Sequence, residues 1–361
     1  MGSCDFCKVV SEDQLKRCVC RKVSYCSKEC QVKDWKSHKS SCPPYTIRES
    51  PGKGRGLFTT RKIKEGQIIL EEYPFHILRA TMSLDEFKTI HYPNIADDTK
   101  ARILELHDPA ENLVTLDSET LQKLISNNPE MMLWKVTRSE EICKIYRIFS
   151  VNNIKICAEP DLYRDTNEAG LYHKLSHINH SCVPNASISW IIGDFKRRQV
   201  RALMDIEKDE EILGSYRAAK EFIYGPREFR RQELLETQGF LCDCSECSLE
   251  GENLEENERL RAKYREKKAE IEQVMRSEFC NSGSLKKIMK LAQKKIKLCQ
   301  KLNIRSMFVT ELIEHYQLAG LAREKGVSCE NDADTFKQEA QKYAKMYGDV
   351  YINLYRKWFN N

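Results

Sequence analysis

The sequence predicts an α+β protein of several domains, and three observations support this fold class. Short apolar segments punctuated by glycine and proline fill the middle of the chain, as is typical of small β-sheets. Apolar residues recur every three or four positions in 82–150 and again beyond residue 251, which indicates helices. Closely spaced cysteines occupy 1–42 and 242–247, where they indicate small metal-binding modules.

Length and composition set broad limits. The chain has 361 residues and a formal net charge of +5, which is long enough for two or three domains with a buried core. No apolar run approaches the roughly 20 residues of a membrane-spanning helix, and the amino terminus lacks a signal-peptide pattern. We therefore expect a soluble protein without membrane association, in which the clustered members of the sixteen cysteines bind metal rather than form disulfides.

Positive charge gathers at the amino terminus. Residues 1–42 carry nine Lys/Arg and five Asp/Glu, so most of the net excess lies in this first module. Without an aromatic pattern or a nucleic-acid-binding motif, the patch gives no strong nucleic-acid signal, and we interpret it as a solvated basic surface.

The first 42 residues have the spacing of a zinc module. Eight potential ligands occur in pairs and end in His-x3-Cys, and Zn²⁺ takes four such ligands tetrahedrally, so two closed sites are expected. A segment this short buries little core, so metal must supply folding energy. Free surface cysteines would not explain the pairing. The eight residues are Cys4, Cys7, Cys18, Cys20, Cys26, Cys30, His38 and Cys42.

The remaining elements follow in order. A short helix over 28–39 is capped by Ser27, and a glycine-rich turn over 50–56 could be a phosphate loop but lacks the Lys-Ser/Thr of one. Pro226 can occupy the first position of a helix that runs to about Glu236. Strands are predicted at 45–48, 57–60, 68–72, 151–158, 169–172, 185–192, 196–206 and 210–215, and carboxy-terminal helices at 252–278, 285–302, 305–325 and 333–359.

Four motifs in this order resemble a SET-domain lysine methyltransferase, and the cysteine module narrows the resemblance to the SET-and-MYND (SMYD) family. They are the turn Gly52–Leu57, the segment Asn179–Asn185 (NHSCVPN), Tyr216, and the segment Gly239–Cys247 (GFLCDCSEC). The cysteine module precedes the glycine turn in the chain, and this order resembles an arthropod-enriched branch of the family.

The resemblance implies a SET β-clip with a helical insert and four regions along the chain. They are a MYND-type zinc finger at 1–42, a SET domain at 45–217 with its insert at about 82–150, a post-SET zinc region at 226–250, and a helical, tetratricopeptide-like region at 251–361.

The same resemblance implies a site for S-adenosylmethionine. The Asn179 side chain would meet the amino-acid end of the cofactor, the His180 backbone its adenine, and Phe240 would pack on that adenine. Tyr216 would be the catalytic tyrosine, whose hydroxyl orients the methyl donor and the amine. Taken singly, each of these residues has an ordinary structural explanation. The full cofactor-binding set is Lys53, Gly54, Arg55, Asn152, Ser176, Asn179, His180, Tyr216 and Phe240.

Three Zn²⁺ ions are implied. The family's interleaved pairing would place Cys4, Cys7, Cys26 and Cys30 on one ion and Cys18, Cys20, His38 and Cys42 on a second. One residue fewer than usual separates Cys18 from Cys20. A third ion would bind Cys182, Cys242, Cys244 and Cys247.

Methyl transfer to lysine is a direct displacement, so donor and amine must lie in line about 3 Å apart. The lysine must be neutral, and a narrow apolar channel lowers its pKa from about 10.4. Two residues depart from the family pattern at this channel: Ile154 stands where an aromatic is frequent, and Gln238 where a tyrosine is frequent. Gly214 likewise replaces an apolar residue and is expected to loosen its strand.

The sequence therefore predicts a protein-lysine N-methyltransferase of the cytoplasm and nucleus, a monomer acting on a histone or non-histone protein. The alternative is an interaction scaffold or corepressor with a weak or inactive SET domain. In the family, the finger helix binds proline-rich peptides, and Gln31 and Trp35 occupy the corresponding positions. Trp35 could equally be the apolar plug of a very small domain.

Overall fold

A computed structural model describes most of the chain. The expected ligand Cys20, the middle of the expected insert (111–139, apart from residue 122) and the expected last helix, 333–359, lie almost entirely outside the described residues. The described residues are 2–11, 15–18, 22–39, 41–110, 122, 140–157, 165–191, 193–217, 219–276 and 282–305, with single positions between 307 and 338.

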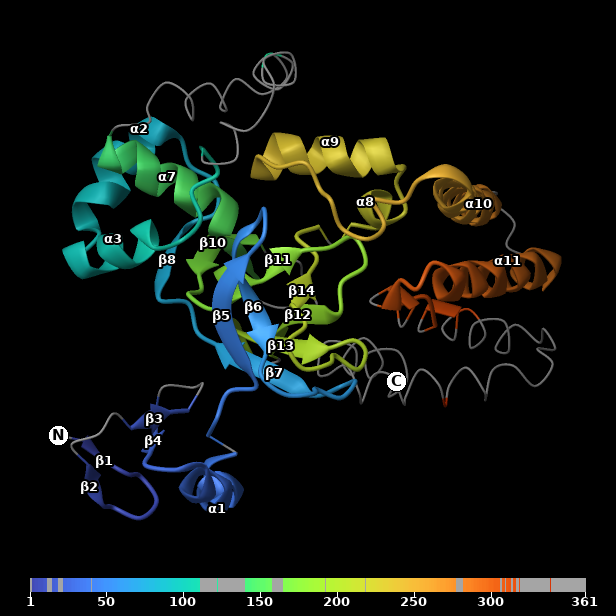
Figure 1. The fold of residues 1–361 in the computed structure, drawn as a ribbon. Helices are drawn as coiled ribbons and strands as arrows, with labels where there is room; N and C mark the ends of the chain where they lie inside the picture. Colours follow the sequence, from blue (N-terminus) through green and yellow to red (C-terminus); the bar gives the residue numbers. More distant parts are fainter. Residues whose placement is uncertain are drawn as a thin grey trace.

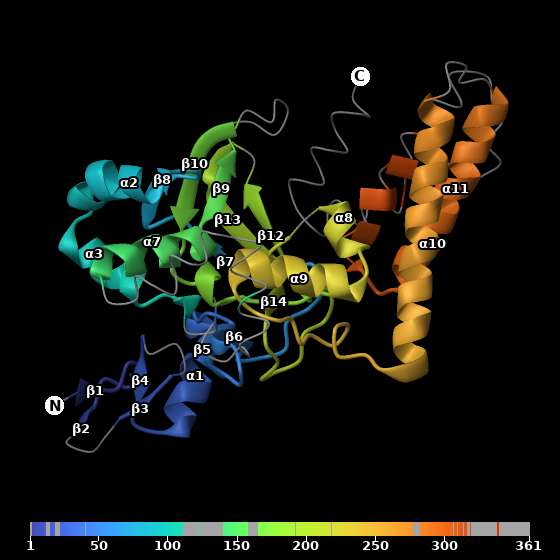
Figure 2. The ribbon, with the colours of Figure 1, turned by 90° about the horizontal axis from the view of Figure 1, so that it is seen from above.

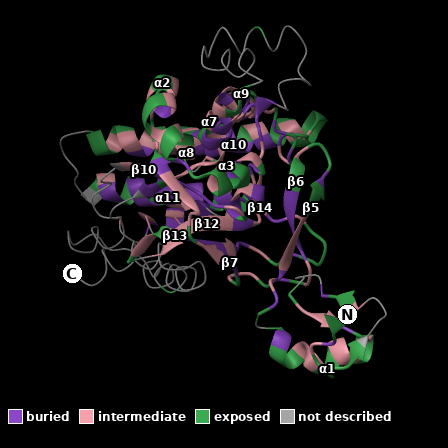
Figure 3. Cartoon of the chain, turned by 90° about the vertical axis from the view of Figure 1, so that its left-hand side faces the viewer, coloured by how far each residue is buried: buried purple, intermediate pink, exposed green. Residues whose placement is uncertain are grey.

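The amino-terminal module consists of two small hairpins and one helix, at one end of the molecule (Figure 1). Ser27 caps α1 by accepting a hydrogen bond from Cys30 N at 3.3 Å, as the sequence predicts, and the helix ends at His38. Figure 3 shows exposed residues over much of α1. The elements are β1 (Gly2–Ser3), β2 (Val10–Ser11), β3 (Lys16–Arg17), β4 (Ser24–Tyr25) and α1 (Lys28–His38).

The glycine turn is tighter than expected. β5 (Tyr45–Ser50) and β6 (Gly54–Thr59) form an antiparallel hairpin, so the turn occupies only the residues between them. Gly52 and Gly54 have φ of 73° and 70°, which only glycine adopts freely. Gly56 instead lies within β6, where a Cβ would collide with the Glu211 carboxylate. This third glycine therefore permits close packing rather than a turn.

Two three-stranded sheets flank the centre. Their strand orders are β12-β13-β7 and β8-β10-β9, and each neighbouring pair is antiparallel. Leu70 and Val200 contribute buried side chains from β7 and β13. The strands are β7 (Ile68–Glu72), β8 (His76–Arg79), β9 (Ile154–Cys157), β10 (Asp165–Leu171), β12 (Ala186–Ile191) and β13 (Asp194–Ala202).

The insert is helical where it is described. Buried apolar residues of its helices, such as Phe87, Ile103 and Ile148, share one core with β8 and β10. The last helix continues to Asn152, so β9 begins three residues later than predicted. The helices are α2 (Leu84–Glu86), η1 (Phe87–His91), η2 (Tyr92–Asn94), α3 (Asp97–Leu104) and α7 (Glu141–Asn152).

Two distant segments meet as a short parallel pair at the centre of the molecule. β11 (Asn179–His180) pairs with β14 (Leu213–Gly214), and Ser181 N donates to Gly214 O at 2.8 Å. The Asn185 side chain extends this pairing, donating to Glu211 O and accepting from Leu213 N, each at 2.8 Å. η3 (Leu175–His177) leads into β11. The segments that the sequence singles out are thus held against each other.

The carboxy-terminal helices pack beside the cysteine segment. α10 and α11 lie side by side as a pair (Figure 2) and share a core with Cys182, Cys242 and neighbouring residues. Pro226 precedes α9 as its N-cap and is not its first residue, contrary to expectation. The helices are α8 (Lys220–Ile223), α9 (Arg227–Gln238), α10 (Gly251–Arg276) and α11 (Ser282–Lys301). Among the described helices, none is long and apolar enough to cross a membrane.

Candidate cofactor pocket and metal centres

A pocket lies where the glycine turn, the end of α7, the β11–β14 pair and the cysteine segment converge. Gly54 lies just outside its lining, at the start of β6. Eight of the nine cofactor residues expected from the sequence line it: Lys53, Arg55, Asn152, Ser176, Asn179, His180, Tyr216 and Phe240. The other lining residues are Gly52, His107, Val151, Gln238, Leu241, Cys242 and Asp243.

The Asn179 carboxamide is held in one orientation. Its Nδ2 donates to Glu211 Oε1 at 2.7 Å and to Arg55 O at 3.3 Å. Both partners can only accept, because one is a carboxylate and the other a carbonyl, so the nitrogen must face them. The carboxamide oxygen is then the atom left to receive a hydrogen bond from a ligand.

Tyr216 is fixed at both ends. Its backbone N donates to His180 Nδ1 at 3.0 Å, and its hydroxyl donates to Ile178 O at 3.1 Å. Although 39% of the residue is exposed, it lines the pocket with its ring edge-on to Phe240, at 6.1 Å between centroids. Burial of the hydroxyl, and then the Glu211 carboxylate, raise the pKa of Tyr216 above its ordinary value, so the phenol is neutral.

His180 is neutral as well. It is only 4% exposed, and burial lowers its pKa to about 4. Its Nδ1 accepts the hydrogen bond from Tyr216 N, which requires that nitrogen to carry no proton. The histidine therefore serves as a fixed acceptor that positions the tyrosine.

Two contacts join the segments that surround the pocket. Lys53 Nζ lies 3.2 Å from Asp243 Oδ1, which joins the glycine turn to the cysteine segment. Arg55 donates through its guanidinium to Glu105 O, which joins β6 to the end of α3. Asn152 Nδ2 donates to His107 O at 3.0 Å and orients the helix end beside them.

Buried polar atoms without a protein partner point to a polar ligand. Ser176 Oγ lies in the pocket wall with no hydrogen-bond partner among the described residues. Beside it, His177 is 3% exposed and both its ring nitrogens lack a partner in this part of the chain. An unpaired buried polar atom costs about 1–3 kcal/mol of free energy, so a ligand that hydrogen-bonds to Ser176 Oγ would relieve this cost and bind more tightly. These residues suit a charged, hydrogen-bonding cofactor.

Cysteine and histidine side chains gather in three clusters, and within each cluster the ligand atoms lie within 4.8 Å of one another. The clusters follow the interleaved pairing that the resemblance implies. They are Cys4, Cys7, Cys26 and Cys30; Cys18, His38 and Cys42; and Cys182, Cys242, Cys244 and Cys247.

The sulfur spacing fits zinc rather than disulfides. Zn–S bonds of about 2.3 Å in a tetrahedron place the sulfurs about 3.8 Å apart, whereas a disulfide brings them to about 2.05 Å. The Sγ–Sγ distance is 3.6 Å for Cys182–Cys247, 3.6 Å for Cys26–Cys30 and 3.7 Å for Cys18–Cys42.

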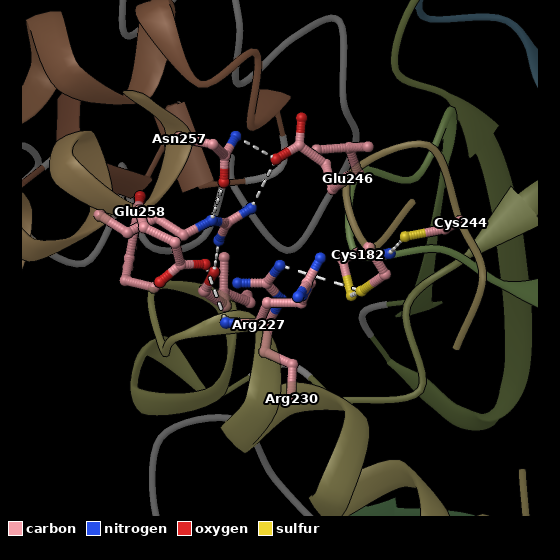
Figure 4. A network of polar contacts seen from close by, with 12 residues as sticks. Cys182, Arg227, Arg230, Cys244, Glu246, Asn257 and Glu258 are labelled. Carbon is pink, nitrogen blue, oxygen red and sulfur yellow. Dashed lines mark hydrogen bonds and ion pairs between the residues drawn. The ribbon is translucent and has the colours of Figure 1, made fainter. Parts of the chain in front are cut away.

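Arg230 lies beside the third cluster, near Cys182 (Figure 4). Arg230 is fully buried, with Nη2 3.9 Å from Cys247 Sγ and Nη1 donating to Gly225 O at 2.5 Å. A zinc tetrathiolate carries a net charge of −2, so Arg230 compensates charge that would otherwise be buried alone. Arg261 of α10 is also fully buried and pairs with Glu246 at 3.0 Å, which docks the helix on the cysteine segment.

Family models match both halves of this architecture. Residues 54–217 match the SET domain and residues 4–42 match the MYND finger. Among curated proteins, the chain is 30% identical over 246 residues to histone-lysine N-methyltransferase ASHR1 of Arabidopsis thaliana, covering 68% of this chain and 46% of that protein. The chain belongs to the SET and MYND domain (SMYD) family.

Other relatives of this SMYD protein have a similar extent of match. It is 26% identical over 250 residues to N-lysine methyltransferase SMYD2-A of Xenopus laevis, covering 68% of this chain and 50% of that protein. It is also 26% identical over 260 residues to human histone-lysine N-methyltransferase SMYD3, covering 68% and 51%. The chain therefore spans about half the length of the curated relatives it matches.

The SMYD pocket contains polar residues that sequence reasoning missed. Glu211 fixes Asn179, and His107 and Asp243 line the wall. The position of Glu211 gave one weak signal, since it is an acidic residue at the start of an apolar strand. His107 and Asp243 lie in irregular segments with no periodic pattern, so only the folded arrangement brings them to the site.

The residues that depart from the family pattern lie in different parts of the fold. Gln238 ends α9 and lines the pocket, and Ile154 begins β9 and packs against the central core. At Gly214, a Cβ would lie 3.1 Å from Ile188 and 3.2 Å from Ile178, so these two side chains pack closely against the glycine backbone. The loosening of this strand stays a prediction.

In the MYND finger, Trp35 packs against the small core formed with Tyr25 and the cysteines. Its ring lies edge-on to His38, and the Arg61 guanidinium of the SET domain lies 5.7 Å from the ring centroid. Trp35 therefore serves as packing within the finger and at its junction with the next domain. Peptide binding by Gln31 and Trp35 stays a prediction.

Proposed function

We propose that this chain is an S-adenosylmethionine-dependent protein-lysine N-methyltransferase. The observation that carries the proposal is the constrained pair Asn179 and Tyr216, which face one pocket from the two paired central segments. The relatives named above are methyltransferases that act on lysine.

The residues of the pocket would bind the cofactor in a single orientation. The Asn179 carboxamide oxygen would accept from the ammonium of the amino-acid end, and Lys53 and Arg55, which line the same pocket, would bind its carboxylate. Ser176 supplies a hydroxyl that has no described protein partner, and Phe240 offers an aromatic face to the adenine. When bound, S-adenosylmethionine supplies a methyl group on a positively charged sulfur.

The chain's own part in the reaction is positional. The Tyr216 hydroxyl is neutral and fixed to Ile178 O, so its oxygen can orient the donor and the incoming amine without exchanging a proton. The aromatic and apolar surroundings favour the neutral form of a substrate lysine, whose nitrogen is the nucleophile. A bound cofactor would give up its methyl group to the lysine nitrogen, and the proton that this nitrogen must lose would pass to solvent, since Tyr216 is not required to take it.

The three cysteine clusters are proposed to hold three Zn²⁺ ions with structural roles. The substrate is proposed to be a protein lysine, on a histone or another protein, and the chain is proposed to act as a monomer in cytoplasm and nucleus. The finger is proposed to recruit a proline-rich partner through Gln31 and Trp35.

The experiment uses full-length, zinc-loaded protein. Titration calorimetry measures binding of S-adenosylmethionine, and a radiolabelled methyl donor reports transfer to proteins of a cell extract. The proposal is supported if the protein binds the cofactor and transfers methyl groups to a protein of the extract. Lysine-to-arginine substitution in that labelled protein must then abolish the transfer. Absence of cofactor binding from folded, zinc-loaded protein would reject it.

A second function, a partner-recruiting scaffold, is favoured by Gln238 in the pocket wall and by Ile154, which packs against the central core. A polar amide in place of an aromatic ring favours the neutral form of a substrate lysine less strongly. Cofactor binding without any transfer in the same assay would support the scaffold.

A further inference from the structure

A second hollow lies between the MYND finger and the SET domain, apart from the cofactor pocket. It is a groove of about 900 Å³, and its walls come from the end of α1, the start of β5, the length of β7 and the loop at 173–174. In Figure 1 the finger lies beneath β5 and β7, and the chain passes from one to the other through Pro43 and Pro44.

The groove is strongly basic. Its cationic lining residues make no ion pair with any described carboxylate. Glu71 is the acidic side chain in the lining, and it is already occupied, since it pairs with Arg197 and accepts from Gln199 Nε2 at 2.6 Å. The cationic residues are Lys22, Lys36, Lys39, Arg61 and Lys174.

Arg61 is the most enclosed of these cations. Its Nη2 donates to Cys42 O at 3.0 Å, and its Nη1 is shielded from solvent without a hydrogen-bond partner among the described residues. A guanidinium suits bidentate binding of a carboxylate, and an unpaired buried N–H is costly. The groove therefore has positive charge at its rim and an unfilled donor in its wall.

One wall is the edge of a sheet. β7 pairs with β13 along one side and has no strand on its other side among the described strands. Residues 67–71 all line the groove, and Ile68 is 41% exposed there. An unpaired strand edge is a template for an added strand. The five residues of β7 span about 17 Å, enough to pair with a segment of similar length.

We propose that this groove binds an extended, Asp/Glu-rich segment of a partner protein, which adds as a strand to β7 and places its carboxylates against the basic residues. The backbone edge supplies hydrogen bonds, and apolar side chains of alternate residues contact Ile68 and Tyr45. The chemistry favours a peptide over nucleic acid, because the described lining has Tyr45 as its lone Phe, Tyr or Trp side chain and no face for successive base stacking.

The test is fluorescence anisotropy with full-length, zinc-loaded protein and a labelled eight-residue peptide of alternating Asp and Val. We expect binding that weakens as salt rises, and no binding of the Lys/Val counterpart. The double variant Lys36→Glu/Lys39→Glu should weaken binding at least tenfold. Lys28→Glu/Lys33→Glu changes the same charge on the same helix outside the groove and should alter it less than twofold.

Two further arms separate the alternatives. A peptide methylated on alternate backbone nitrogens keeps its charge but cannot pair as a strand, so equal binding would overturn strand addition. A single-stranded oligonucleotide of equal charge that binds more tightly and displaces the peptide would overturn the peptide as occupant. If the finger variant loses zinc, Lys174→Glu repeats the test from the SET side, and unchanged peptide affinity there would overturn the proposal.

Discussion

The Glu211 carboxylate accepts a hydrogen bond from Asn179 Nδ2 at 2.7 Å across two segments that lie 32 residues apart. The same carboxylate packs against Gly56, so two of the four motifs meet on one side chain. Since the bond fixes the asparagine oxygen toward the pocket, Glu211 is a positioning residue for whatever that oxygen binds.

Glu211→Ala should weaken cofactor binding on the order of tenfold. It leaves Asn179 Nδ2 without its stronger partner and frees the carboxamide to rotate, a loss of about 1–2 kcal/mol. Glu211→Gln retains an acceptor oxygen and should restore most of the affinity. Titration calorimetry measures both, with the exposed Glu49→Ala as control. Equal affinity in all three variants would show that the asparagine needs no anchor.

Elemental analysis of purified protein should find three zinc ions per chain. Each cluster offers thiolate ligands at the spacing of a tetrahedral site, and Cys20 would complete the cluster that has three described members. Cys182→Ala should lower the content to two and reduce thermal stability. A wild-type content of two, unchanged by Cys182→Ala, would mean that the buried third cluster holds no ion.

Arg230→Met should destabilise the third cluster specifically. The guanidinium balances a buried anionic centre, and removing one partner of a buried charge pair typically costs about 3–5 kcal/mol. We expect a lower melting temperature and faster release of one zinc to a chelator. Arg276→Met, at an 82% exposed position at the end of α10, should behave as wild type. Identical rates of zinc release from the two variants would show that Arg230 does not balance the charge of this cluster.

Local sequence spacing predicted most of what is local in the structure. The Ser27 cap and the antiparallel pair of β12 and β13 depend on neighbours close in the chain, and the structure contains both, although β13 spans Asp194–Ala202 rather than 196–206. Glu211, by contrast, acts on residues far away in the chain. The close packing of Ile178 and Ile188 on Gly214 is likewise a contact that only the folded chain creates.

Stability should fall as pH falls through the range set by His177. Burial, followed by Arg55 and His173, lowers the folded-state pKa of this histidine to about 4, against 6.5 for the ordinary side chain. Because the folded pKa is depressed, the neutral histidine contributes no penalty above about pH 6.5. As pH falls toward about 4, this histidine is protonated in the unfolded chain before it is protonated in the folded one. The free energy of unfolding therefore falls by on the order of 3 kcal/mol.

His177→Gln removes this proton uptake and should flatten the difference in melting temperature between pH 7 and pH 4.5. Comparing variant with wild type at each pH cancels the acid release of zinc that both share. His173→Gln is the matched control, since the His173 side chain is 32% exposed and lies 3.3 Å from Glu105. Parallel pH profiles for His177→Gln and wild type would contradict the assignment.

Tyr216→Phe should separate binding from chemistry. The substitution removes one oxygen and little volume, so the ring keeps its edge-on contact with Phe240 and the backbone hydrogen bond to His180 remains. Loss of one positioned group at a transition state typically costs about 10²–10³ in rate. We expect near-wild-type cofactor affinity by calorimetry and loss of most methyl transfer. Asn179→Ala should lose both, because it removes the cofactor acceptor itself. If Tyr216→Phe transfers methyl groups at the wild-type rate, the hydroxyl serves only its bond to Ile178, and the alignment of donor and amine must come from the backbone around it.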